Sequence, residues 1–319
     1  MAITNTHRNT ARRPWFTATR KEAALGWLFA MPWIIGFLVF TVGPMLFSLY
    51  TSFTKYNITT PPQWIGLGNY QELFADDRFY TSLYNTFWMV VVKLPIVTVA
   101  SVSIALLLAM DLPGGRLFRT VIYLPNVLSG VAAVFLWQWI LRPNGLLNEA
   151  LSWFGIKGPG WFVDPLWTKP GMVVMGMWWI GSNILIYLSG IKGIPKDLYE
   201  AATIDGARGW KKVRHITLPL LSPTIFFQIV TGIIGTFQVF TTAYILTGAD
   251  SAGGGPGQSL LFYVLYLYNR AFGRSGPAGF QMGYASAMAW ILFIIILAIT
   301  LLQLWLAKRW VYYESGDAH

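Results

Sequence analysis

Long apolar segments dominate the sequence, and short polar stretches separate them. A helix that crosses the hydrocarbon core of a bilayer needs about 20 predominantly apolar residues. Six segments are long enough: 24–52, 85–110, 121–141, 171–191, 218–246 and 284–307. The pattern therefore predicts an all-α membrane protein with six transmembrane helices.

Composition agrees with this prediction. The chain is 55% hydrophobic and only 11% charged, whereas soluble domains carry roughly 25% charged residues. The net charge of +10 does not indicate nucleic-acid binding, because the basic residues flank apolar segments instead of forming one face. Cysteine is absent and the three histidines are scattered. We therefore predict no disulfide, no thiolate chemistry and no metal site.

The distribution of Lys and Arg predicts the orientation. Fifteen basic residues lie in the termini and alternate loops of one side, against seven in the loops of the other. The positive-inside rule then places both termini in the cytoplasm. This gives a cytoplasmic tail 1–23, a transmembrane domain 24–310 with a cytoplasmic loop 194–217, and a cytoplasmic tail 311–319. The first apolar run is too long for a signal peptide and is expected to remain as an anchor.

The outer loops are short and rich in Gly, Pro and Trp. The loop 247–281 contains GADSAGGGPGQS, which predicts a flexible, turn-rich connection. The phosphate-binding pattern G-x-x-x-x-G-K-[ST] does not occur in the sequence. We therefore expect no cofactor on this chain, and any ATP that drives it would bind to another chain.

The stretch YEAATIDGARGWKKVRHITLPL, residues 199–220, holds the densest group of charges. Pro195 and Asp197 favour a helix start, and Gly206 favours a break or a close approach. We expect two short helices with a bend at the membrane surface, the second running over 210–215. Residues alone leave two interpretations open: a docking element, or a basic loop that only reflects topology.

The spacing within this stretch resembles the EAA motif of binding-protein-dependent ABC importer permeases. The matching positions are Glu200, Ala201, Ala202, Gly206, Ile216, Leu218 and Pro219, with Asp205 before the glycine. In that family the loop forms coupling helices that sit in a cleft of a cytoplasmic ATPase subunit. The resemblance implies that Glu200 pairs with a basic residue of the ATPase and that Gly206 marks the bend.

Residues 64–87, 118–148 and 194–207 are similar to carbohydrate permeases of the maltose type. The resemblance implies a type I importer permease fold in the inner membrane. It also implies a second related permease, two copies of an ATPase that bind ATP and Mg, an extracytoplasmic sugar-binding protein and no enzyme activity in this chain. The maltose protein's extra spans and large external domain are missing, so maltose is not implied.

Sugar sites combine flat aromatic surfaces with neutral hydrogen-bonding groups. Within the apolar segments such candidates are Trp178, Trp179, Ser182, Asn183, Gln238, Thr242, Ser129 and Gln138. By resemblance, Trp178, Trp179, Ser182 and Gln238 fall closest to the family's sugar site. The alternative is that the polar groups bond between helices and the tryptophans belong to the interfacial belt.

Two other functions stay open. The same machine could carry a polyol or a glycerol phosphate, although an anionic solute would favour a basic residue facing the path. An ion-coupled carrier is the other alternative, but such carriers often place Asp, Glu or His at membrane depth. Lys93 is the ionisable residue well inside an apolar segment, and we expect its side chain to snorkel toward the interface.

Overall fold

The computed structural model describes residues 20–110, 113–248, 253–273 and 279–312. The predicted tails 1–23 and 311–319 therefore lie mostly outside the described residues. The chain divides into two compact units, 1–50 and 51–319. Each unit is described by itself.

The first unit is one helical rod. Helix α1 (Arg20–Phe37) continues through the π-helical turn η1 (Leu38–Val42) into α2 (Gly43–Ser52). The backbone N–H of Gly43 donates to the carbonyl of Leu38, five residues back. Proline lacks an N–H group, so the wider turn accommodates Pro44 without ending the helix. The predicted first span is confirmed as a long apolar helix over Leu25–Ser52.

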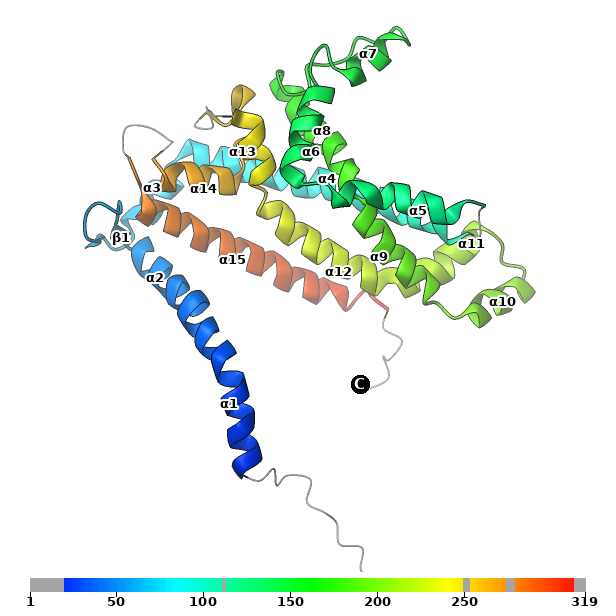
Figure 1. Ribbon diagram of the computed structural model, residues 1–319, viewed down its shortest axis with the longest axis horizontal. Helices are drawn as coiled ribbons and strands as arrows, with labels where there is room; N and C mark the ends of the chain where they lie inside the picture. The colour runs from blue at the N-terminus through cyan, green and yellow to red at the C-terminus, as the bar shows by residue number, and fades with distance from the viewer. Residues whose placement is uncertain (1–19, 111–112, 249–252, 274–278, 313–319) are drawn as a thin grey trace, which may run out of the picture. The chain divides into compact units, whose positions relative to one another are not determined.

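Helix α4 (Asp77–Ala109) is the longest helix of the second unit. It begins eight residues before the predicted start of the second span, because the Asp76 side chain accepts a hydrogen bond from the Arg78 N–H and caps the helix. It packs along α9 (Gly181–Lys192) and α12 (Leu218–Phe237), as Figure 1 shows. Met89 and Ala105 are fully buried on it.

Two predicted spans are not single helices. The third consists of α5 (Gly115–Tyr123), the 3-10 turn η2 (Leu124–Val127) and α6 (Gly130–Ile140), bent by 101°. The fourth consists of α8 (Pro165–Gly176), the 3-10 turn η3 (Met177–Trp179) and α9, bent by 52°. Counting each bent pair as one crossing, the described helices provide the six crossings that the sequence predicts.

The fifth span also differs from its prediction. Its helix begins at α11 (Trp210–Lys212), passes through the π-helical turn η4 (Val213–Thr217) and continues as α12, so Leu218 is inside the helix and not its start. The helix is interrupted after Phe237 and resumes as α13 (Thr241–Thr247).

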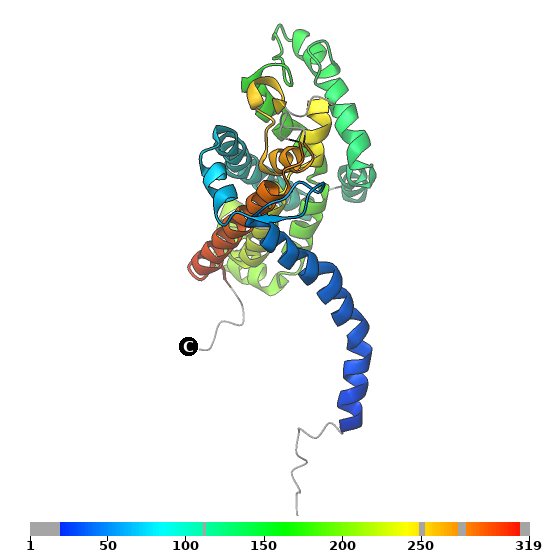
Figure 2. The ribbon, with the colours of Figure 1, turned by 90° about the vertical axis from the view of Figure 1, so that its left-hand side faces the viewer.

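The last span is confirmed: helix α15 (Met282–Ala307) begins two residues before the predicted start and ends at the predicted residue. It packs against α12. Figure 2 shows α12 and α15 side by side.

Short elements connect these helices. The strands β1 (Thr54–Lys55) and β2 (Gln63–Trp64) pair antiparallel. The remaining short helices are α3 (Gly68–Phe74), α7 (Leu146–Ser152) and α10 (Lys196–Ile204).

The described part of the loop 247–281 contradicts a flexible connection. It holds the turn η6 (Pro256–Gln258) and the helix α14 (Tyr263–Ala271), which packs against α4 and α15. Leu260, Leu261, Phe262 and Tyr263 are at most 1% exposed. The sequence LLFYVLYLY is too short to predict as a span, although its apolar character indicates burial.

Side chains of α4 satisfy the backbone of this buried segment. The Asn85 amide donates to the carbonyls of Gln258 at 2.8 Å and Leu261 at 3.1 Å. The Thr86 hydroxyl accepts from the Tyr263 N–H at 2.9 Å and donates to the Ser82 carbonyl. A buried segment without regular structure needs such partners, because an unsatisfied backbone group is costly away from water.

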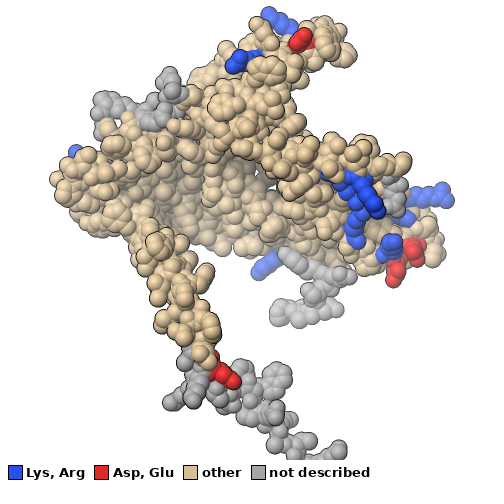
Figure 3. Space-filling model, in the orientation of Figure 1, with Lys and Arg blue, Asp and Glu red and all other residues tan. Residues whose placement is uncertain are grey.

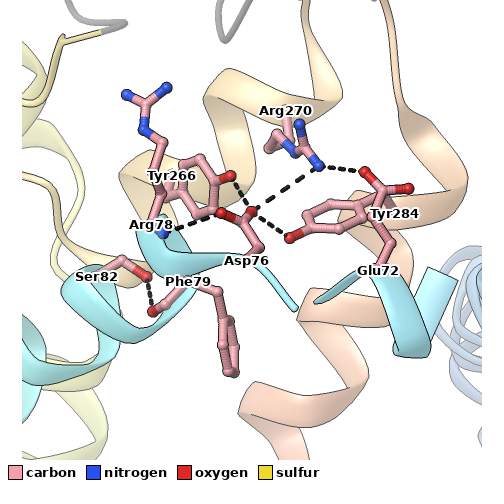
Figure 4. Close-up of polar contacts among 8 residues, drawn as sticks. All are labelled: Glu72, Asp76, Arg78, Phe79, Ser82, Tyr266, Arg270 and Tyr284. Carbon is pink, nitrogen blue, oxygen red and sulfur yellow. Dashed lines mark hydrogen bonds and ion pairs between the residues drawn. The ribbon is translucent and has the colours of Figure 1, made fainter. Parts of the chain in front are cut away.

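A cluster of polar residues around Asp76 joins the start of α4 to α14 and α15 (Figure 4). The Asp76 carboxylate accepts hydrogen bonds from the hydroxyls of Tyr266 and Tyr284. The Arg270 guanidinium lies 3.9 Å from Asp76 and 2.6 Å from Glu72. Burial acts to raise the pKa of the Asp76 carboxyl, but the tyrosine hydroxyls, the Arg78 N–H and Arg270 outweigh it and hold this pKa below its usual value.

We predict that Thr86→Val lowers the free energy of unfolding by about 1–3 kcal/mol, because the buried Tyr263 N–H loses its acceptor. Val keeps the shape of Thr, so the change isolates the hydroxyl. Thermal unfolding in detergent measures the effect. Thr81→Val is the matched control, since the Thr81 hydroxyl makes an exposed bond to the carbonyl of Asp77 within the same helix. Equal unfolding temperatures for the two variants would contradict the prediction.

Candidate functional site

The loop 194–217 contains the first predicted short helix, α10, and the predicted bend, but the second predicted helix over 210–215 is the beginning of the long helix α11–η4–α12. Helix α10 ends at Ile204, and Gly206 follows in the left-handed region with φ +77°. The Ala207 N–H donates to the Ala202 carbonyl at 2.8 Å, and the Gly206 N–H donates to the Thr203 carbonyl at 3.0 Å. These two bonds define a Schellman cap, which requires its left-handed residue at a fixed distance from the last helical turn. The spacing between the alanine pair and Gly206 is therefore the spacing of a helix C-cap.

Two side-chain hydrogen bonds join α10 to the residues after the bend. The Tyr199 and Thr217 hydroxyls lie 2.9 Å apart, and the Lys212 ammonium donates to the Thr203 hydroxyl at 2.6 Å. The first bond joins α10 to η4, which continues directly into α12. Helix α10 is thereby fastened to the base of a long membrane helix.

Helix α10 has two distinct faces. Tyr199 and Ala202 are half-buried toward the rest of the unit, whereas Glu200, Ala201 and Ile204 are exposed. Ile204 is 87% exposed, the largest exposed fraction among the large apolar side chains of the described residues. Exposed apolar groups beside polar ones mark interaction surfaces. Sequence reasoning missed Ile204, although its position one turn after Glu200 was visible.

The remaining motif residues have structural contacts. Ile216 and Pro219 line a hollow of about 350 Å³ together with Leu198, His215, Leu220 and Tyr312. Leu218 packs against the buried cluster around Ile184 and Leu221. Asp205 is the C-cap residue of α10. Ile216, Leu218 and Pro219 thus lie in η4 and α12 and not on α10, whereas Asp205 is exposed at the end of α10.

Three interruptions of the membrane helices form the second candidate site, which we call the interrupted region. It comprises η2, η3 and the break Gln238–Phe240. The turn η2 lies against η3 and α9. Gly181 permits this approach, because a Cβ there would come within 3.1 Å of the Tyr123 Cα. Non-helical backbone at membrane depth is tolerated where it is buried in protein or lines a water-filled cavity.

Several predicted residues meet partners in the interrupted region. The Ser182 hydroxyl donates to the Asn126 side-chain oxygen at 3.2 Å, and Gln228 donates to the Asn183 side-chain oxygen at 3.2 Å. The rings of Trp178 and Trp137 contact edge to face with centroids 5.6 Å apart. Sequence reasoning missed Asn126 and Trp137, although Asn126 directly follows Pro125 inside an apolar segment.

Other predicted residues offer unused polar groups. Among the described residues, no side chain or backbone group hydrogen-bonds the side chains of Ser129, Gln138, Gln238 and Thr242. The indole N–H groups of Trp137 and Trp178 are buried without an acceptor in the described part of the chain. Trp179 is half-buried and packs against the cluster around Met89. Helices α6 and α13, which carry Gln138 and Thr242, pack together.

Lys93 does not snorkel as predicted. It lies near the middle of α4, one turn from each of the buried residues Met89 and Val97 on the same face. A Cβ at Gly176 would come within 2.8 Å of the Lys93 Cε and 3.4 Å of its Nζ. The side chain therefore packs inside the unit, next to the residue that precedes η3. Within the described residues, no group of three or more His, Asp or Glu side chains is placed to hold a metal ion.

Several long apolar helices and interrupted crossings, with a capped helical loop exposed at their ends, define a multi-pass membrane protein. The chain belongs to the family of binding-protein-dependent transport system inner membrane components, whose sequence profile matches residues 78–312. This confirms the predicted membrane localisation. It also confirms that the chain is a transport subunit and not an enzyme.

The chain is similar to transport proteins over most of its length. It is 41% identical to the probable ABC transporter permease protein YesP of Bacillus subtilis, covering 93% of this chain and 95% of that protein. It is 35% identical to the lactose transport system permease protein LacF of Rhizobium radiobacter, covering 89% and 94%. A solved bacterial alginate ABC transporter contains a chain with the same fold, at 24% identity, with a TM-score of 0.76 and coverage of 91% and 96%. The type I importer permease fold is thus confirmed.

Proposed function

We propose that the chain forms half of the translocation pathway of an ATP-driven sugar importer, with both termini and the loop 194–217 in the cytoplasm. The observation that carries this proposal is the interrupted region, where aromatic rings and neutral polar groups meet at three helix breaks. Relatives named for transport of lactose and of arabinooligosaccharides support a sugar. The other half of the path would come from a second, related permease.

The exposed face of α10 is proposed to receive the ATPase, two copies of which bind ATP and Mg below the two permeases. Glu200 supplies a carboxylate for a basic residue, and Ile204 supplies an apolar contact beside it. The Tyr199–Thr217 bond and the continuous η4–α12 helix then carry displacement of α10 into the membrane. An extracytoplasmic sugar-binding protein delivers the solute to the opposite end.

Lys93 favours a second candidate substrate class, the acidic sugars. A cation within a membrane helix is costly and usually functional. Among the described residues, Lys93 forms no ion pair or hydrogen bond, and it lies beside the start of η3. A carboxylate-bearing sugar in the interrupted region would supply the missing counter-charge. Neutral oligosaccharides remain the first candidate because the relatives named above transport neutral sugars.

For the coupling face, we predict that Glu200→Ala weakens association with the ATPase at least about 10-fold, since truncating one member of an interfacial charge pair costs about 2–5 kcal/mol. Solute-stimulated ATP hydrolysis of the assembled transporter should fall with it. Glu149→Ala, which removes a carboxylate on α7, serves as the control. Unchanged assembly and hydrolysis in Glu200→Ala would rule out the proposed role of this face.

For the solute site, we predict that Trp178→Ala lowers uptake into vesicles at least about 10-fold, because a stacking surface for the sugar is lost. Trp153→Ala, at an exposed tryptophan of the outer loop, should leave uptake unchanged. Lys93→Gln separates the two substrate classes: it should slow uptake of uronate-bearing oligosaccharides and spare neutral ones. Normal uptake by Trp178→Ala of every sugar that the binding protein binds would contradict the proposed site.

A further inference from the structure

Two adjoining hollows lie at the ends of α4 and α9 that we propose to be cytoplasmic. One has a volume of about 570 Å³ and is lined mainly by apolar residues, among them Leu106, Ala109 and Ile191. The other has a volume of about 690 Å³ and lies between the end of α4 and the start of α5. Met110 and Lys192 line both hollows. The two hollows therefore adjoin at these residues, and we refer to them together as the groove, with an apolar part and a polar part.

Every charged side chain that the structure places on this groove is basic. Arg116 and Arg119 line the polar part, Lys196 and Lys212 line the apolar part, and Lys192 stands between them. Asp111 follows Met110 in the chain and lies outside the described residues. Figure 3 shows Lys and Arg side chains gathered at this end of the molecule. Such a concentration of like charge favours a bound anion.

Arg119 has an unused donor at the groove. Its Nη2 group donates to the Leu108 carbonyl at the end of α4, at 3.2 Å. Its Nε group is buried and has no acceptor among the described residues. A buried guanidinium N–H without an acceptor is costly, and an anion in the polar hollow would supply one.

Helix α5 has the form of a helix at a membrane interface. Arg116 and Arg119 lie three residues apart on one side of it, and both face the polar hollow. Leu117, Phe118 and Val121 on the other side are 54–68% exposed. Because α5 and η2 are bent by 101° from α6, the basic and apolar sides of α5 suit it to the headgroup level at the end of the third crossing. The groove therefore opens where phospholipid headgroups meet acyl chains.

The groove and the proposed ATPase face adjoin on α10, because Lys196 lines the groove and lies one helical turn before Glu200. Lys196 and Tyr199 line the groove, whereas Glu200 and Ile204 are on the exposed face. An occupant of the groove would therefore leave Ile204 free and approach Glu200 only through Lys196. It would also contact α5, α9, α10 and α11 at once, through Arg119, Lys192, Lys196 and Lys212.

We propose that this groove binds an anionic phospholipid of the cytoplasmic leaflet. The phosphate lies among Arg116, Arg119 and Lys192, and an acyl chain follows the apolar hollow. Basic pockets between membrane helices on the cytoplasmic side are suited to such headgroups. The inference rests on the proposed orientation of the chain and not on the identity of the solute. The lipid joins the loop 194–217 to the membrane helices that the loop moves.

Native mass spectrometry of the assembled, delipidated transporter, titrated with phosphatidylglycerol or phosphatidylcholine, tests the proposal. Phosphatidylglycerol should bind at least about 10-fold more tightly than phosphatidylcholine. The triple variant Arg119→Gln, Lys192→Gln, Lys196→Gln should lose about 10- to 100-fold of the phosphatidylglycerol affinity, given the contribution of each basic residue near anionic lipid. The triple variant Arg119→Lys, Lys192→Arg, Lys196→Arg should retain most of it.

Lys55→Gln, Arg142→Gln and Lys157→Gln together make the matched control, with the same change of charge in the outer loops. Ala109→Trp fills the apolar hollow without altering charge and should also weaken phosphatidylglycerol, which keeps the test decisive if the triple Gln variant fails to assemble. Equal loss in the control or equal affinity for the two lipids would overturn the proposal. So would competition by free glycerol phosphate at concentrations comparable to the lipid.

Discussion

The requirement that backbone polar groups find partners away from water governs this structure. A membrane-spanning chain satisfies them most simply with continuous helices, yet here three crossings are interrupted at η2, at η3 and at Gln238–Phe240. The first two interruptions lie against each other, with Gly181 permitting the close approach. The buried segment before α14 also has partners for its backbone, since the side chains of Asn85 and Thr86 hydrogen-bond it. The segment before α14 is surrounded by the protein itself, whereas η2 and η3 contain no buried residue, and Leu124 and Val127 of η2 are 60% and 71% exposed.

This constraint also determines how far the sequence predicts the fold. Hydropathy locates all six crossings, because a run of about 20 apolar residues is rare outside membrane-spanning helices. It does not locate the bend of the third crossing, because Leu124, Val127 and Leu128 continue the apolar run through η2. The apolar sequence of the segment Leu260–Tyr266 indicates burial, but its packing partners α4 and α15 are distant in sequence, so no local pattern predicts where it is buried. The prediction for Lys93 is wrong for the same reason: only its packing against Gly176 shows that it faces inward.

In the loop 194–217 the spacing of residues is more informative than their composition. The distance from Ala202 to Gly206 is a local property of a capped helix, so the bend is predictable from spacing. Which face of α10 remains free is not predictable, because it depends on the bonds of Tyr199 and Thr203 to residues beyond the bend. Those bonds connect α10 to α11 and to η4, which continues into α12. They leave Glu200 and Ile204 exposed and fasten the opposite face to the base of α12.

In the proposed function, the exposed face of α10 receives the ATPase, and the coupling of ATP to transport depends on that contact. The chain contains no cysteine, so single cysteines introduced by Ile204→Cys and Thr203→Cys can be labelled with a maleimide, with and without the ATPase. We expect the ATPase to protect the cysteine of Ile204→Cys at least about 10-fold more than that of Thr203→Cys, because the Thr203 side chain is turned toward Lys212 and away from the exposed face. Equal labelling of Ile204→Cys in the presence and absence of the ATPase would contradict this role of α10.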